Sequence, residues 1–295
     1  MDSRTTDTND LPLSGVRVLD LTTVIFGPYT TQILGDFGAD VIKVEAPEGD
    51  MTRVIRPARN PGMSALYLGC NRNKRSIVLD LKRETARTAL WRLIETADMF
   101  VHNIRPQKIT ELGFSPDRVL QSNPSIIYGG LHGYGEDGPY GGRPAYDDVI
   151  QGQSGIAGLF GERDGLPQLV PSIIADKNSA LIASGGLVAA YVKRLRTGKG
   201  TYLECPMFEG MASFNLVEHQ YGETFKPKKG KAGYVRALSP YRRPHKTKDG
   251  YLCLLAYTDR QWRSFWKLAG MPDYAEDSRF VTMLKRSRNI DTLYK

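Results

Sequence analysis

The sequence has 295 residues, of which 41% are hydrophobic and 24% are charged, and its formal net charge is +8. This balance is typical of a globular protein and excludes a disordered chain, and the length suffices for one large α/β domain and a smaller one. The surplus of positive charge favours anionic ligands, which include nucleic acid, acidic lipid and small molecules rich in phosphate.

Segments typical of strands and of helices alternate between Val16 and Gly135. The sequence predicts strands over residues 16–22, 40–46, 76–81, 98–104 and 125–135, and helices over residues 30–40 and 84–97. Such alternation is typical of βαβ units, so we predict an α/β fold with a Rossmann-like, mostly parallel sheet. Ligands bind beyond the carboxyl ends of the strands in sheets of this kind. Four segments are therefore expected to line a site, those that follow Thr22, Val44, Leu81 and His102.

A long helix is predicted later in the chain, over residues 175–200. Its sequence is rich in Ala and Gly, and it ends in several cations and two glycines, which is typical of a helix C-terminus. Before it, Gly133–Asp148 is predicted to be irregular because of its many glycines, and Val149–Gly161 is predicted to form one short helix.

The basic, glycine-containing segment Lys226–Gly233 is a candidate linker. Beyond it, Gly250–Tyr257 is predicted to be a strand and Asp259–Gly270 a helix. We therefore predict a large Rossmann-like domain over residues 11–224 and a smaller α+β domain over residues 225–295.

The positions of the cysteines and histidines and the length of the apolar stretches exclude several classes of protein. The three cysteines are widely spaced and the four histidines show no metal-ligand pattern, so a disulfide framework and a zinc site are not expected. The first ten residues are polar and acidic, without the apolar core of a signal peptide, and no stretch approaches the length of a membrane span. We therefore predict a cytoplasmic protein with no membrane partner.

Two basic clusters fall where the edge of the sheet is expected to be open. They contain Arg72, Lys74, Arg75 and Lys82, followed by Arg105 and Lys108. The first βα junction carries neither a G-x-G-x-x-G nor a Walker sequence, which disfavours a nicotinamide or ATP enzyme. The clusters suit a ligand with several phosphates, but a solvated basic face is the more usual interpretation of such clusters. Nucleic acid is disfavoured because exposed aromatic residues are not interleaved with the cations.

Asp176 follows an apolar run and opens the predicted long helix. An aspartate in this place is most simply an N-cap, whose oxygen accepts a backbone N–H of the first turn. The same place would keep the carboxylate ionised, because the helix dipole stabilises negative charge there, and an ionised carboxylate can serve as a nucleophile. The residues alone favour the cap and leave the nucleophile open.

Five segments taken in order resemble the family III CoA-transferases, which include the formyl-CoA:oxalate and carnitine CoA-transferases. They are residues 13–50, 71–82, 102–114, 133–155 and 175–200. The resemblance implies an interlocked homodimer in which the large domain binds CoA and carries the catalytic residue. It also implies that Asp176 is a nucleophile that forms an aspartyl-CoA intermediate while CoA moves from an acyl-CoA to a small carboxylic acid. No metal and no permanently bound cofactor are implied, because coenzyme A and acyl-CoA are the substrates.

The same resemblance implies a set of residues that contact CoA. They are Ile25, Phe26, Lys74, Arg75, Leu79, Asp80, Leu81, Lys82, Asn103, Ile104, Arg105, Tyr146 and Asp147. Lys74, Arg75 and Arg105 are the candidates for the phosphates. Ile25 stands where the formyl-CoA transferases carry a glutamine that touches the acyl group, so oxalate and formate are not supported as substrates. Members of the family continue past the last residue of this chain, so the small domain is expected to be incomplete.

Two alternatives to transfer remain open. The α-methylacyl-CoA racemases share the fold and use a histidine at the position of Tyr146 as an acid or base. A tyrosine, with a pKa near 10 in solution, is a poor proton shuttle at neutral pH, which favours transfer over racemisation. The second alternative is a CoA-binding protein without catalytic activity.

Overall fold

The computed structural model describes residues 10–295, which form two compact units. One unit runs to Ser154 and includes Val170–Ala212, and the other consists of Gly155–Leu169 and Ser213–Lys295. The expected large and small domains meet at residue 224, and that boundary stays a prediction. The N-terminal residues from which we predict the absence of a signal peptide lie almost wholly outside the described part of the chain.

The first unit is built on a six-stranded sheet whose strands all run parallel. The strands lie side by side in the order β5 (Lys74–Val78), β2 (Asp40–Glu45), β1 (Arg17–Leu21), β6 (Met99–His102), β7 (Ile127–His132) and β8 (Thr201–Pro206). The prediction of an α/β fold with a Rossmann-like parallel sheet is therefore confirmed. The chain moves outward from β1 in one direction and then from β6 in the other, so a crevice is expected between the carboxyl ends of these two strands.

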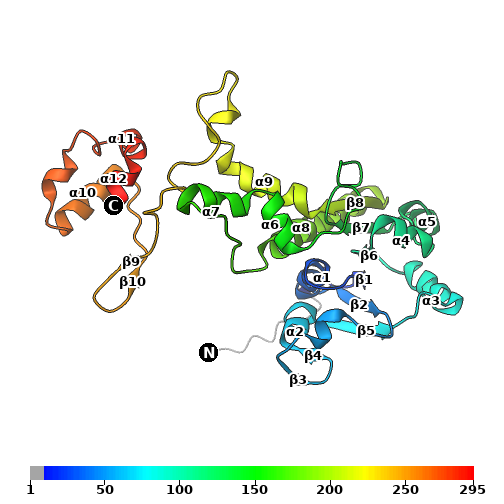
Figure 1. Ribbon diagram of the computed structural model, residues 1–295. Helices are drawn as coiled ribbons and strands as arrows, with labels where there is room; N and C mark the ends of the chain where they lie inside the picture. Colours follow the sequence, from blue (N-terminus) through cyan, green and yellow to red (C-terminus); the bar gives the residue numbers. More distant parts are fainter. Residues whose placement is uncertain (1–9) are drawn as a thin grey trace. The chain divides into compact units, whose positions relative to one another are not determined.

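Helices cover both faces of this sheet (Figure 1). On one face α1 (Phe26–Asp36) and α8 (Ile174–Thr197) pack against each other and against the strands. On the other face, apolar side chains of three helices join the main core: α3 (Glu84–Ile94), α4 (Pro106–Glu111) and α5 (Pro116–Ser122). Gly129 of β7 brings α8 close, because a Cβ there would lie 3.0 Å from the Leu187 side chain.

Smaller elements complete the first unit. They are the 3-10 helix η2 (Met51–Val54), the hairpin of β3 (Ala58–Asn60) and β4 (Met63–Ser64), and the helices α2 (Ala65–Asn71) and α6 (Asp147–Gln153). The predicted helix over Val149–Gly161 is in fact two helices, α6 and α7 (Ile156–Asp164). They are separated at Gly155, whose φ of +89° takes the backbone out of helical geometry.

The first helix starts earlier than the sequence predicts. It begins at Phe26 rather than at residue 30, with Pro28 in its first turn, where a missing N–H costs nothing. Gly27 packs against the end of β1, since a Cβ there would lie 2.2 Å from the Thr22 Cβ. Gly27 therefore allows a close approach of helix α1 to the end of β1.

The second unit consists of short elements. They are α7, the 3-10 helices η3 (Tyr221–Thr224) and η4 (Pro272–Ala275), β9 (His245–Lys246), β10 (Tyr251–Leu252), α10 (Asp259–Leu268), α11 (Met283–Arg288) and α12 (Ile290–Tyr294). Helix α9 (Met207–His219) crosses the boundary of the two units. Trp262 and Trp266 of α10 are buried together, with ring centroids 5.6 Å apart.

The strand expected over Gly250–Tyr257 is limited to β10, which pairs only with β9. An apolar run forms a strand only as far as a partner supplies backbone hydrogen bonds, and β9 is two residues long. All three cysteines are free thiols, with Cys70 and Cys205 buried and Cys253 exposed. In the described residues, no helix is both long enough and apolar enough to span a membrane.

Candidate active site

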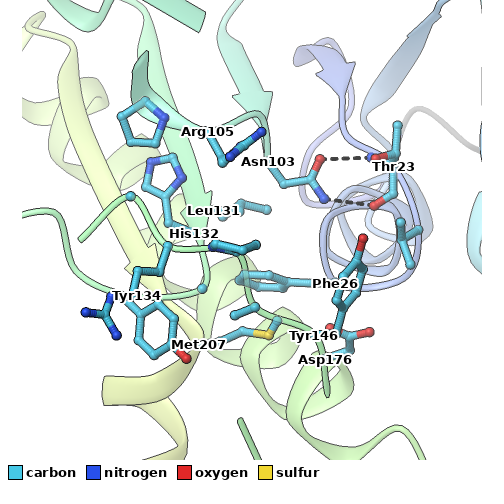
Figure 2. Close-up of a pocket in the computed structure, with 17 residues that line it drawn as sticks. Thr23, Phe26, Asn103, Arg105, Leu131, His132, Tyr134, Tyr146, Asp176 and Met207 are labelled. Atoms are coloured by element: carbon cyan, nitrogen blue, oxygen red, sulfur yellow. Dashed lines mark hydrogen bonds between the residues drawn. The ribbon is translucent and has the colours of Figure 1, made fainter. Parts of the chain in front are cut away.

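A cavity of about 420 Å³, here called the main pocket, opens at the carboxyl ends of β1, β6, β7 and β8 (Figure 2). It therefore lies at the point where the strand order reverses, as expected for a ligand site in such a sheet. Its lining includes Thr23, Val24, Phe26, Asn103, Arg105, His132, Tyr134, Arg143, Tyr146, Asp176 and Met207.

A second cavity of about 310 Å³, the side pocket, lies at the carboxyl ends of β2 and β5. Its lining includes Leu21, Thr23, Val44, Glu45, Asp50, Leu79, Asp80, Leu81, Lys82, Ile104 and Lys108. Thr23 lines both cavities, so they adjoin at the loop that follows β1. The four segments that the sequence predicts around a site all contribute to one cavity or the other.

The loops after β1 and β6 are joined by two hydrogen bonds between Thr23 and Asn103, drawn in Figure 2. The Thr23 backbone N donates to the Asn103 side-chain oxygen at 3.0 Å, and the Asn103 Nδ2 donates to the Thr23 carbonyl at 2.8 Å. The next residue, Val24, has a φ of 72°, which is unfavourable for a β-branched side chain. Such strain persists only where the surrounding contacts fix the backbone, so this wall of the main pocket is held in one conformation.

A buried network of charges lies behind that loop. The Asp20 carboxylate accepts hydrogen bonds from Thr22, Thr31 and Lys74, whose Nζ is 2.9 Å away. Burial by itself raises the pKa of Asp20, but the charges of Lys74 and Lys43, together with the hydrogen bonds from Thr22 and Lys74, lower it to about 2. Asp20 is therefore ionised at neutral pH, and its partners fix the end of β1 where the pocket begins.

Lys74 and Arg75 are neighbours in the chain with different surroundings. The side chain of Lys74 is 2% exposed and points into the network around Asp20, whereas the guanidinium of Arg75 is exposed and pairs with Asp40. Neither residue lines the main or the side pocket. Both cations are already paired with carboxylates, and this geometry gives Lys74 a structural role.

We expect Lys74→Ala to lower the free energy of unfolding by about 3 kcal/mol, because it leaves a buried carboxylate without its cation. Arg75→Ala is the matched control and should cost less than about 1 kcal/mol, because its ion pair is exposed to water. Urea unfolding of both variants at pH 7 measures the difference. Equal losses for the two variants would contradict the structural role of Lys74.

Asp176 is the third residue of α8 and is not its N-cap. The cap position is Ile173, which provides no side-chain hydrogen bond. Expecting Asp176 to cap the helix is therefore wrong, because the helix begins two residues before it. Its side chain lines the main pocket and is buried, with 7% of the residue exposed. Within residues 10–295 no hydrogen-bond donor is placed on its carboxylate, which is left available to a ligand.

The charge state of Asp176 also differs from the expectation. Burial raises the pKa of its carboxyl to about 7, and the negative charge of Asp147 adds to the effect. Asp147 is buried as well, and its carboxylate accepts hydrogen bonds from the Asp176 backbone N at 3.0 Å and from Gln151 Nε2 at 2.6 Å. Desolvation and a neighbouring carboxylate therefore outweigh the helix dipole, and Asp176 is only partly ionised at neutral pH.

We expect Asp147→Asn to lower the pKa of Asp176. The acid limb of the pH–rate profile for the CoA transfer that the family resemblance implies should then move to lower pH. The asparagine oxygen still accepts the Asp176 N–H, while the charge that opposes ionisation is gone. The profile of kcat/KM between pH 5 and pH 9 measures the shift. A matched thermal unfolding midpoint at pH 8 shows whether the fold is unchanged, and an unmoved limb would contradict the role of Asp147.

The residues expected to contact CoA fall into three groups. Phe26, Asn103, Arg105 and Tyr146 line the main pocket with Asp176. Leu79, Asp80, Leu81, Lys82 and Ile104 line the side pocket. Ile25, Lys74, Arg75 and Asp147 line neither; Ile25 is buried at the start of α1.

Sequence reasoning placed Tyr146 in the segment that follows β7 but missed the rest of the pocket wall that follows β7 and β8. Arg143 and Met207 line the main pocket there, and Arg143 has no acidic partner among the described residues. The segment Thr201–Pro206 was not predicted as a strand, although apolar and polar residues alternate in part of it. Without this sixth strand, the segments that follow it cannot be placed at the same edge.

One group of possible metal ligands lies near this wall. His132, Glu136 and Glu204 can bring a nitrogen and two oxygens within 4.8 Å of one another. Glu204 accepts a hydrogen bond from the Glu136 backbone N at 2.7 Å, and Glu136 accepts one from Tyr202 at 2.7 Å. These bonds explain the group as an anchor for the loop after β7, and we assign it no metal.

Comparison with known proteins identifies the family. The model of CoA-transferase family III matches residues 13–295. The chain belongs to this family. Membership confirms the resemblance drawn from the five segments, and with it the prediction of an enzyme of the transferase class.

Individual relatives are similar over most of the chain. A probable fatty acyl-CoA transferase of Mycobacterium tuberculosis is 35% identical, with 94% of this chain and 74% of that protein covered. The succinyl-CoA:glutarate CoA-transferase of Mus musculus is 35% identical, with 96% of this chain and 65% of that protein covered. The crystal structure of a hypothetical protein from Mycobacterium tuberculosis has a TM-score of 0.83 and 33% identity, covering 96% of this family III chain and 76% of that one.

Proposed function

We propose that the protein transfers CoA from an acyl-CoA thioester to a carboxylic acid, with Asp176 as the nucleophile. The observation that carries the proposal is a buried carboxylate in a cavity at the strand-order reversal, with no hydrogen-bond donor on it among the described residues. Membership of CoA-transferase family III supports the reaction type. The chain spans between 65% and 74% of the lengths of the two relatives described above, so the activity of the whole protein is part of the proposal.

We further propose that CoA occupies both pockets. Nine residues expected to contact CoA line them, and the shared Thr23 allows one elongated ligand to pass from one to the other. The side pocket, with Leu79, Leu81 and Ile104 in its wall and Lys82 beside them, suits the nucleotide. The thioester then lies in the main pocket beside Asp176, where Arg105 and Arg143 can bind the oxygens of a phosphate or a carboxylate.

The proposed reaction divides one exchange into four substitutions at carbonyl carbons. The Asp176 carboxylate attacks the thioester, and the CoA thiolate leaves as a mixed anhydride forms. The thiolate attacks the aspartyl carbonyl, which releases the donor acid and leaves an aspartyl-CoA thioester. The acceptor carboxylate attacks that thioester, so that the thiolate leaves and a second mixed anhydride forms. The thiolate then attacks the acceptor carbonyl of this anhydride, which forms the product acyl-CoA and breaks the bond to Asp176. Asp176 ends as a free carboxylate, and no proton is gained or lost overall.

Racemisation of acyl-CoA is less well supported. It requires a group that exchanges protons at the position of Tyr146, which is 64% exposed and lines the main pocket. The racemases carry an imidazole at this position, and this chain carries a phenol instead. Transfer needs no such group, because each step exchanges one acyl bond for another.

We also propose that the protein is a homodimer and works in the cytoplasm. Leu181, Val192 and Leu195 of α8 are exposed in the single chain, and at 100° per residue they share one helix face. Such a face is commonly buried by a partner subunit. The three free thiols are compatible with a reducing compartment. Light scattering after size-exclusion chromatography measures the mass in solution, and a monomer would contradict the proposed homodimer.

An exchange assay tests the proposed function. The protein is incubated with succinyl-, acetyl- or branched acyl-CoA and with a set of acceptor acids that includes glutarate, and product acyl-CoA is measured by mass spectrometry. We expect transfer with at least one pair and, during turnover, hydroxylamine modification at Asp176. Binding of CoA with no transfer for any pair would favour the non-catalytic alternative.

A further inference from the structure

The second unit contains a cavity of about 280 Å³ that the proposed reaction does not use. We call it the arginine cavity, because three arginines line it. Its lining is Arg236, Tyr241, Arg242, Arg243, Pro244, His245, Cys253, Leu254, Leu255 and Tyr294. The segments that flank the hairpin of β9 and β10 supply most of this lining, residues 241–244 before it and 253–255 after it, and α12 supplies Tyr294.

No acidic side chain belongs to this lining. Among the described residues, Arg236, Arg242 and Arg243 form no ion pair, while the nearby Arg286 does pair with Asp259. The lining therefore carries three cationic side chains and no carboxylate, with Arg242 and Arg243 exposed to water. Because like charges repel, an anion that binds between them lowers the free energy of the site.

Arg236 supplies a second observation. Its Nε is buried and donates no hydrogen bond within residues 10–295. Burial by itself lowers the pKa of its guanidinium, but the phenols of Tyr294 and Tyr234 lie against the group and raise that pKa above its usual value. The group is thus held in place at the cavity wall with part of its donor capacity unused. A guanidinium with free N–H donors matches the paired oxygens of a carboxylate or a phosphate.

We propose that the arginine cavity binds a small oxyanion with two or more negative charges, either a phosphate group or a pair of carboxylates. The apolar Pro244, Leu254 and Leu255 in the same lining can contact the uncharged part of such a ligand. The proposal does not rest on Asp176 or on the pockets of the first unit.

Cys253 provides a direct test, because it lines the cavity and is the exposed thiol, whereas Cys70 and Cys205 are buried. The full chain is treated with iodoacetamide, a neutral reagent, and the rate of alkylation at Cys253 is followed by peptide mass spectrometry. Inorganic phosphate and succinate are the two probes, each compared with sodium chloride at equal ionic strength. We expect saturable protection by at least one probe and none by sodium chloride.

The two probes distinguish the source of the oxyanion. Protection by phosphate alone assigns the cavity to a phosphate-bearing ligand, and protection by succinate alone assigns it to a dicarboxylic acid. Protection by both supports a site for either group. Equal rates with both probes and with sodium chloride overturn the proposal.

Two double variants provide a matched comparison. Arg242→Gln with Arg243→Gln removes two charges from the lining, and the dissociation constant of the protecting probe should rise about tenfold or more. Lys246→Gln with Lys248→Gln removes the same charge from the hairpin region outside the lining and should leave that constant unchanged. Equal constants for the two variants overturn the proposal. CoA binding should be unchanged in both, which separates this result from a failure of the proposed function.

Discussion

Asp176→Ala is expected to lower the rate of CoA transfer by roughly four orders of magnitude or more, because it removes the proposed nucleophile. The carboxylate lines the main pocket and has no hydrogen-bond donor among the described residues, so it is available to attack a bound thioester. The dissociation constant for CoA should change little, since most of the proposed contacts lie in the side pocket and around Arg105. Steady-state exchange and calorimetric titration with CoA measure the two quantities.

Asp176→Asn is the control for shape. The amide has the size of the carboxylic acid but cannot form a mixed anhydride, so this variant should be as inactive as the alanine variant. Substantial transfer by either purified variant would contradict the nucleophilic role. In the wild-type protein, activity should fall about tenfold for each pH unit below the Asp176 pKa of about 7, because only the ionised form attacks.

Asp176→Asn is also expected to stabilise the fold at pH 8, by an amount on the order of 4 kcal/mol at most. The ordinary pKa of an aspartate is 3.8, and in the folded protein the pKa of Asp176 is about 7. Between these two values the folded state binds the proton more tightly than the unfolded state, so the stability of the wild type falls as pH rises from about 4 to about 7. Above pH 7 the whole cost of the buried charge is present, and asparagine removes it.

Urea unfolding of the wild type and the asparagine variant at pH 8 and at pH 4 measures this effect. The variant should unfold at higher urea concentration at pH 8, and the difference should become small at pH 4, where the wild-type carboxyl is neutral in the folded state. A variant that is less stable than the wild type at pH 8 would show that the buried, ionised carboxylate of Asp176 does not destabilise the fold. The expected gain in stability with loss of activity is typical of a residue placed for chemistry.

The order of strands and helices in the first unit could be predicted because it depends on local pattern. Alternating apolar segments predicted five of the six parallel strands, and the principle that ligands bind beyond their carboxyl ends predicted the segments around both pockets. The sixth strand, β8, was missed because it follows directly on the basic, glycine-containing end of α8. Its pairing with β7, far away in the sequence, makes it a strand.

Residue types and their order also determined the family. Five segments in a fixed order were sufficient for a resemblance that the family model extends over residues 13–295. The resemblance gave Asp176 as the nucleophile, a role that the residue's own neighbours in sequence did not distinguish from a helix cap. The first residue of α8 could not be predicted from the local sequence, because the N-cap residue, Ile173, has no side chain that can accept a capping hydrogen bond.

The electrostatics of the site were decided by tertiary structure alone. Lys74 and Arg75 are adjacent cations in the sequence, and only the fold buries one against Asp20 while it leaves the other in water. In the same way, Asp147 stands 29 residues before Asp176, and packing brings its carboxylate to the Asp176 backbone. The sequence by itself determined the sheet, the family and the candidate nucleophile. Only the tertiary structure decided that the pKa of this carboxyl is raised to about 7, because desolvation and charge–charge repulsion depend on neighbours in space.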